Sequence, residues 1–209
     1  MTRLAILDLD GTLVDSVEDL GASVNHALSA LGLPPRSTDE IRSFVGEGAR
    51  VLLARAISPR DELLEPALAL WRGHYDAHCL DRTRLYPGVG AALAGAGRVL
   101  AVHTNKPGAL ARKILAGLGV AGRFVAIVGG DEAPRKPDPA GTLEIMARVD
   151  AAPGETVFVG DSRVDAATAR AAGVALVAVT WGLGTRAELA AAGATVFVDD
   201  AAELAPHLR

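Results

Sequence analysis

Short, continuous apolar runs recur along the chain and predict the strands of a buried sheet. Because the runs are continuous rather than alternating, they are typical of parallel strands that are covered on both faces. Ala-rich segments separate most of them, and Pro107, Pro139 and Gly173 mark helix starts and ends there. This alternation predicts an α/β fold with a doubly wound parallel sheet. The runs are Leu4–Leu7, Val99–Val102, Phe124–Val128, Val157–Val159, Leu176–Val179 and Val196–Val198.

The long interval between the first two runs has helical patterns and no convincing strand. Ser16–Asp19 predicts a capping box at the start of a first helix. Ser37–Glu40 is expected to start a second helix and Ser58–Pro59 a third. We therefore expect a small helical domain inserted after the first strand. The predicted division is 15–82 for the helical domain and 1–14 with 83–209 for the α/β core.

Composition and charge exclude several classes of partner. Half of the residues are hydrophobic but only 4% are aromatic, so Ala, Leu and Val must build the core. The net charge is −4 and no basic stretch is typical of a nucleic-acid interface. No apolar stretch approaches the roughly 20 residues of a membrane span, and the first apolar run is too short for a signal peptide. We expect a cytoplasmic protein, a monomer or homodimer, that binds a small molecule.

Two carboxylates follow the first predicted strand. Asp8 and Asp10 alternate along the chain, so their side chains can point the same way. Such a pair usually needs a cation or a shared proton. Two solvated residues in a turn before Gly11 would give the same pattern. In open parallel sheets ligands bind beyond the carboxyl ends of the strands, so we expect the chemistry there.

Two further segments offer groups that suit a phosphate. Thr104 and Asn105 follow the second run, where a hydroxyl and backbone N–H groups before a helix can hold phosphate oxygens. An ordinary helix cap at Thr104 is the alternative. Lys136 lies in a Pro-rich turn and is one of three lysines among 21 basic residues. Its compact ammonium is suited to act as a point charge on a phosphoryl group.

A second acidic pair follows the fourth run. Asp161 and Asp165 are four residues apart where a helix is predicted to begin, so both can face one point. Favourable charge at a helix N-terminus is the alternative explanation. Together with Asp8 and Asp10, these groups indicate a site for a hard divalent cation, and we expect Mg²⁺.

The combination resembles the haloacid dehalogenase-like superfamily and, within it, the phosphoglycolate phosphatase group. The predicted insertion resembles the helical cap domain of this family, and Gly129–Asp131 also resembles the phosphoglycolate phosphatase group. Leu9 departs from the family pattern, in which Phe is commoner, and should alter packing only. The motifs that carry the resemblance are Asp8–Ser16, Thr104–Lys106, Lys136–Pro139 and Gly160–Asp165.

This resemblance implies a role for each site residue. Asp8 would attack phosphorus and form an aspartyl-phosphate, and Asp10 would act as general acid and then general base. Thr104, Asn105 and Lys136 would bind the phosphoryl oxygens. The implied Mg²⁺ ligands are the carboxylates of Asp8 and Asp161 and the backbone carbonyl of Asp10, with Asp165 either holding a metal-bound water or orienting Lys136.

The resemblance also implies a substrate site in the helical insertion. The Gly46–Gly48 stretch resembles the cap loop that touches substrate, and Arg50 follows it. We expect Gly46 there, and Arg50, Arg42 or Arg55 on the carboxylate of 2-phosphoglycolate. Solvated arginines would give the same sequence.

Several other functions stay open at this stage. A phosphomutase, a pyrophosphatase or sugar phosphatase, and a non-catalytic phosphate-binding protein share the scaffold. The spacing of His74, His78 and Cys79 is also used in zinc sites, but no further ligands lie near them in the sequence, so we expect no zinc.

Overall fold

The computed structural model describes residues 3–208, which divide into two compact units. The core unit comprises the chain up to residue 15 and from residue 85 onward, and the helical unit comprises residues 16–84. The boundaries expected from the sequence, 14/15 and 82/83, lie within two residues of these.

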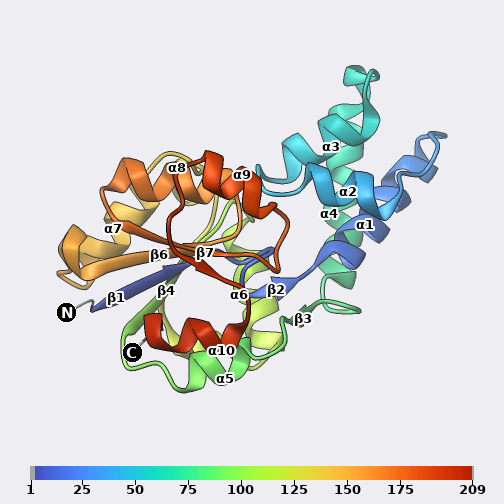
Figure 1. Ribbon diagram of the computed structural model, residues 1–209. Coiled ribbons are helices and arrows are strands. Elements are labelled where there is room, and N and C mark those ends of the chain that lie inside the picture. The colour runs from blue at the N-terminus through green and yellow to red at the C-terminus, as the bar shows by residue number, and fades with distance from the viewer. Residues whose placement is uncertain (1–2, 209) are drawn as a thin grey trace. The chain divides into compact units, whose positions relative to one another are not determined.

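A six-stranded parallel sheet forms the centre of the core unit, in the order β5-β4-β1-β6-β7-β8 (Figure 1). Each apolar run that we predicted as a strand forms a strand of this sheet. The prediction of a doubly wound parallel α/β sheet is confirmed, because the chain adds strands first on one side of β1 and then on the other. The strands are β1 (Leu4–Leu7), β4 (Val99–His103), β5 (Phe124–Val128), β6 (Thr156–Gly160), β7 (Ala175–Val179) and β8 (Phe197–Val198).

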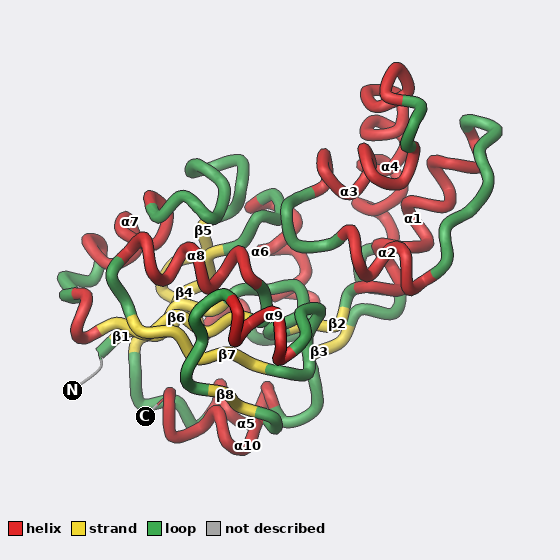
Figure 2. The backbone as a smooth tube through the Cα atoms, turned by 45° about the horizontal axis from the view of Figure 1, so that its top comes forward, coloured by secondary structure: helices red, strands yellow, loops and turns green. Residues whose placement is uncertain are grey.

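The strand β1 lies between β4 and β6, and all of its residues are buried. Leu4 is in register with Val99 on one side and Thr156 on the other. The three strands therefore end at the same edge, and Figure 2 shows them side by side. This register brings the residues that follow β1, β4 and β6 together.

Helices cover the sheet of the core unit on both faces (Figures 1 and 2). Ile145 and Met146 of α7 and Ala169 of α8 pack with Ile6 and Phe158 in one buried cluster. As predicted, Pro107 and Pro139 precede α6 and α7, and Gly173 ends α8 with a φ of 70°. The helices are α5 (Val89–Ala94), α6 (Gly108–Gly117), α7 (Ala140–Arg148), α8 (Arg163–Ala172), α9 (Arg186–Ala191) and α10 (Ala201–Leu204).

The helical unit contains α1 (Val17–Ala30), α2 (Thr38–Phe44), α3 (Ala49–Ile57) and α4 (Leu64–His78). Its most extensive packing is between α1 and α4. The second helix begins where the sequence predicted, and Ser37 and Glu40 form a capping box at its start. The helix α3 was not predicted, and α4 begins at Leu64 rather than at Ser58. No helix in the described part of the chain is both long and apolar enough to cross a membrane.

The capping box predicted for α1 is wrong. Ser16 makes no side-chain cap hydrogen bond. Asp19 instead accepts hydrogen bonds from the backbone N–H groups of Arg82 and Thr83 and, at 2.7 Å, from the Thr83 hydroxyl. These partners satisfy a carboxylate that is only 3% exposed. Asp19 therefore bonds to residues far away in the sequence rather than to the start of its own helix. Two short strands that the sequence did not predict, β2 (Val14–Asp15) and β3 (Arg84–Leu85), form a separate two-stranded sheet, although they are far apart in the sequence.

Candidate active site

Three neighbouring strands deliver the candidate residues to one edge of the sheet. Asp8 directly follows β1, Thr104 follows β4 and Asp161 follows β6. All three are buried. The candidate site thus lies where the strand order reverses, which is the usual ligand position in open α/β sheets.

Three carboxylates meet at this edge. Ligand oxygens of Asp8, Asp161 and Asp165 all lie within 4.8 Å of one another. Burial raises the pKa of Asp8 to about 7, with Asp165 adding to the shift and Lys136 opposing it. Burial also raises the pKa of Asp161 to about 8, and the charges of Asp165 and Asp8 push it further in the same direction. Buried like charges of this kind favour a bound cation.

The donor atoms fit a hard divalent metal ion. Carboxylate oxygens are the ligands that such ions prefer. Although Asp8 Oδ1 forms an ion pair, no aligned hydrogen bond reaches it. Among the described residues, no other group of His, Cys, Asp and Glu is close enough to hold a metal.

Asp161 is fixed by a tight pocket of small residues. Its Oδ1 accepts a 2.7 Å hydrogen bond from the Thr12 hydroxyl, and its Oδ2 accepts one of 2.7 Å from the Leu183 N–H. A Cβ atom on Gly11 would lie 2.2 Å from Asp161 Oδ2, and one on Gly182 would lie 2.4 Å from it. Both positions therefore require glycine. Leu183 and Gly182 follow β7, and no sequence signal connected them to the site.

Lys136 lies between two of the carboxylates. Its Nζ is 2.8 Å from Asp8 Oδ1 and 2.7 Å from Asp165 Oδ1. Burial alone would lower the pKa of Lys136, but the carboxylates of Asp165 and Asp8 raise it above its usual value. The ammonium therefore stays charged beside Asp8.

Asp165 is held by several hydrogen bonds of its own. Its Oδ2 accepts a 2.6 Å bond from the Ser162 hydroxyl and longer bonds from the N–H groups of Ser162 and Asp161. The bond from Ser162 N–H belongs to the capping box of α8, in which Asp165 N–H also donates to the Ser162 hydroxyl. Asp165 Oδ1 accepts a 2.7 Å hydrogen bond from Lys136 Nζ, and the same side chain belongs to the group of three carboxylates.

The side chain of Asn105 lies on the backbone of Lys136 rather than on an open site. Asn105 Oδ1 accepts a hydrogen bond from Lys136 N–H, and Asn105 Nδ2 donates one to Lys136 C=O. The Thr104 hydroxyl accepts a 3.2 Å bond from Lys106 N–H. The residue that precedes α6 is Pro107, so Thr104 is not an ordinary helix cap.

Asp10 has a partner that the sequence did not predict. Lys106 Nζ lies 2.8 Å from Asp10 Oδ1 and 2.9 Å from Asp10 Oδ2. The side chain of Lys106 is only 4% exposed. Asp10 does not belong to the group of three carboxylates. The one sequence signal that singles out Lys106 is the rarity of lysine in this chain.

His103 is a buried, neutral residue beneath the site. Its Nδ1 lies 2.9 Å from the Thr142 hydroxyl. Burial, followed by the nearby charge of Lys136, lowers the pKa of His103 to about 3. A Cβ atom on Gly141 would lie 2.4 Å from His103 Nε2, so the ring has no room to move toward α7.

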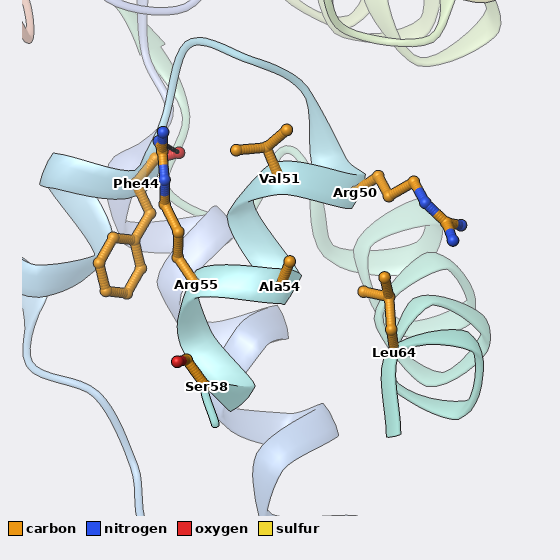
Figure 3. A pocket seen from close by; sticks show the side chains of 7 residues that line it. All are labelled: Phe44, Arg50, Val51, Ala54, Arg55, Ser58 and Leu64. Carbon is orange, nitrogen blue, oxygen red and sulfur yellow. Dashed lines mark hydrogen bonds between the residues drawn. The ribbon is translucent and has the colours of Figure 1, made fainter. Parts of the chain in front are cut away.

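Gly46 and Arg50 belong to the helical unit. Arg50 lines an open groove of about 600 Å³ (Figure 3). It forms a 2.6 Å ion pair with Glu65, and Arg55 forms one of 2.6 Å with Glu47. Figure 3 shows the two guanidinium groups on opposite sides of the groove. The groove is lined by Phe44, Arg50, Val51, Ala54, Arg55, Ser58 and Leu64.

The histidines of α4 stack rather than converge on a point. The His74 ring lies 4.2 Å from the His26 ring and 4.3 Å from the His78 ring, measured between ring centres. His74 Nδ1 is 2.9 Å from the Ser23 hydroxyl. Stacking of this kind does not direct ring nitrogens to one ion.

Known proteins resemble this chain in both sequence and fold. A family model described as haloacid dehalogenase-like hydrolase matches residues 5–179. Phosphoglycolate phosphatase 1 of Pseudomonas aeruginosa is 39% identical, over 99% of this chain and 79% of that protein. Phosphoglycolate phosphatase of Rhodospirillum rubrum is 38% identical, over 100% of this chain and 91% of that protein. A crystal structure described as a predicted phosphoglycolate phosphatase from Haemophilus somnus 129PT has a TM-score of 0.93 and 31% identity, covering 100% of this chain and 98% of that one.

Proposed function

Because the chain belongs to the haloacid dehalogenase-like hydrolase family, we propose that it is a magnesium-dependent phosphatase that hydrolyses 2-phosphoglycolate to glycolate and phosphate. The family and the curated relatives indicate a phosphoric monoester hydrolase. The observation that carries the proposal is the meeting of Asp8, Asp161 and Asp165 at one buried point, with Lys136 beside Asp8.

Asp8 is the nucleophile of the first step. A bond forms between its carboxylate and phosphorus, the bond from phosphorus to the ester oxygen breaks, and the electron pair stays on that oxygen. Repulsion would keep a dianionic phosphate away from an unaccompanied carboxylate. Lys136, 2.8 Å from Asp8 Oδ1, reduces that repulsion. It also stabilises the charge on the phosphoryl oxygens during transfer, and Thr104 lies at the neighbouring strand end to bind one of them.

Asp8, Asp161 and the backbone carbonyl of Asp10 would hold the Mg²⁺ ion. When bound, Mg²⁺ neutralises phosphoryl charge and fixes the orientation of the group for in-line attack. Thr12 and Leu183 keep Asp161 in place for this role through their hydrogen bonds. Asp165 contributes through Lys136, which it orients.

Asp10 moves the protons. It gives a proton to the leaving alkoxide in the first step and takes one from the water that hydrolyses the aspartyl-phosphate in the second. At the end of the second step Asp10 is protonated again and the Asp8 carboxylate is free. The two steps therefore restore the starting state of both residues.

The helical unit, in this proposal, is the cap that selects the substrate. Arg50 would leave Glu65 and bind the carboxylate of 2-phosphoglycolate, near Gly46. The side chains of Arg50 and Glu65 are 53% and 72% exposed. Exposed ion pairs contribute only about 0–1 kcal/mol to stability, so breaking the Arg50–Glu65 pair to bind the substrate costs little free energy.

The deciding experiment is a phosphate-release assay with 2-phosphoglycolate, a set of sugar phosphates and pyrophosphate, each with and without Mg²⁺. We expect the highest kcat/KM for 2-phosphoglycolate, and release only with the metal. Equal rates across the substrates would remove the substrate assignment. Transfer of phosphate to a sugar without release would identify a phosphomutase instead.

A further inference from the structure

Each of the two strand-end carboxylates of β1 has its own buried lysine. Lys136 forms an ion pair with Asp8. Lys106 forms one with Asp10, and its Nζ lies 2.8 Å from Asp10 Oδ1 and 2.9 Å from Asp10 Oδ2. An ammonium that is nearly equidistant from both oxygens restrains the position of the carboxylate and the direction in which it points. The pair joins residues 96 positions apart in the sequence.

The backbone of Lys106 is itself held from two sides. Its N–H donates to the Thr104 hydroxyl, and its C=O accepts a 3.0 Å hydrogen bond from Gly130 N–H. Gly129 packs so closely that a Cβ atom on it would lie 2.2 Å from Gly108 N and 2.9 Å from Lys106 O. The Gly129–Gly130 turn thus holds the backbone of Lys106 in place, and this backbone position directs the ammonium to Asp10.

A purely structural ion pair is a weak explanation of this arrangement. The cost of removing both charges from water offsets most of the attraction between them, so buried pairs add little stability over apolar residues. Arginine is also the usual cation of this chain, and two of its three lysines lie on Asp8 and Asp10. A compact ammonium can contact both oxygens of one carboxylate at a single atom.

We propose that Lys106 is a positioning residue for the acid–base carboxyl of Asp10, a role that rests on the proposed phosphatase function. In the ester-cleaving step, the proton of Asp10 passes to the ester oxygen as the bond from phosphorus breaks. Lys106 holds Asp10 in the orientation for this transfer, and its ammonium faces the negative charge that then forms on Asp10. Esters with poor leaving groups depend on the transfer, whereas esters with good leaving groups do not.

The test compares two esters in the first turnover of the full-length enzyme with Mg²⁺. The alcohol of 2-phosphoglycolate is a poor leaving group and that of 4-nitrophenyl phosphate is a good one. For Lys106→Met we expect the first-turnover rate to fall about 100-fold with 2-phosphoglycolate and less than about threefold with 4-nitrophenyl phosphate. The matched control, Lys113→Met on the exposed side of α6, should leave both rates within about twofold of wild type.

Equal losses with the two esters would overturn the proposal, because they would place Lys106 on the phosphoryl group or on the fold. Unchanged rates would overturn it as well. If Lys106→Met does not fold, Lys106→Arg keeps the charge and is measured in the same way, with a smaller loss that is again larger for 2-phosphoglycolate. A folded wild-type enzyme that cleaves neither ester would instead refute the proposed function, and this role of Lys106 with it.

Discussion

The side chain of Asn105 holds Lys136 by the backbone, with 2.8 Å between Asn105 Oδ1 and Lys136 N and 3.1 Å between Asn105 Nδ2 and Lys136 O. The motif that follows β4 is thereby connected to the lysine that pairs with Asp8. Asn105 holds the backbone of Lys136 in place, and Asp165 holds its ammonium group.

Replacing Asn105 with Ala should therefore impair catalysis through Lys136. We expect kcat for 2-phosphoglycolate to fall about 10- to 100-fold, because a small displacement of a group that stabilises the transition state has a large effect on rate. Steady-state kinetics and thermal unfolding measure the two consequences separately. Wild-type kcat in a folded Asn105→Ala variant would contradict the positioning role.

Asp8→Asn should abolish turnover without unfolding the protein. An amide is not a nucleophile for phosphorus, so we expect a loss of at least about 10³-fold in phosphate release. Asp39→Asn, on the exposed surface of α2, is a control with the same chemical change. Undiminished turnover by a normally folded Asp8→Asn variant would refute the assignment of the nucleophile.

Mg²⁺ should stabilise the wild-type protein against heat. A ligand that binds only the folded state adds about 2.7 kcal/mol at 100 times its Kd, which corresponds to an increase of several degrees in Tm for a domain of this size. Asp161→Asn should lose most of the increase, because it removes one of the grouped carboxylates. Calorimetry with and without the metal measures both. An undiminished increase in Tm would place the ion elsewhere.

His103 should make the protein sensitive to acid. The pKa of His103 is about 3 in the folded state against 6.5 for an unperturbed histidine. Because the unfolded state binds the extra proton, the full contribution to stability is present above pH 6.5 and is lost as the pH falls from 6.5 toward 3. Between pH 7 and pH 5 the free energy of unfolding should fall about 2 kcal/mol more in wild type than in His103→Asn. Urea titrations at the two pH values give this difference, and parallel curves would exclude His103 as the cause.

Arg50→Gln should affect substrate binding more than chemistry. If Arg50 binds the carboxylate of 2-phosphoglycolate, its loss should raise KM about 10-fold and leave KM for 4-nitrophenyl phosphate within about twofold. Arg60→Gln is the matched control, since Arg60 is another exposed arginine of the helical unit and pairs with Glu62. The same KM change with both esters would argue against contact with the carboxylate.

The strands could be predicted from the sequence because each is a continuous apolar run on a sheet covered by helices. Asp8, Thr104 and Asp161 could be predicted as one group because parallel strands end at a common edge. The helix α3 was missed because its first turn follows directly on the glycine-rich loop at 46–48, which carries no N-cap side chain.

Contacts between distant residues could not be predicted. Thr12 and Asp161 are 149 positions apart, and Asp19 and Thr83 are 64 positions apart. Local sequence favoured a helix cap for Asp19, but three backbone and hydroxyl donors from the far end of the unit bind it instead. Such partners become visible only once the chain is folded, because no local pattern encodes them.

The groups that we assign to phosphoryl transfer come from the core unit, on both sides of the 16–84 insertion in the sequence. The insertion can therefore diverge without changing the nucleophile, the acid–base carboxyl or the carboxylate cluster. Exchanging residues 16–84 for the corresponding segment of a relative is expected to transplant selectivity while hydrolysis persists. The architecture separates two properties that most mutations of a single-domain enzyme would alter together.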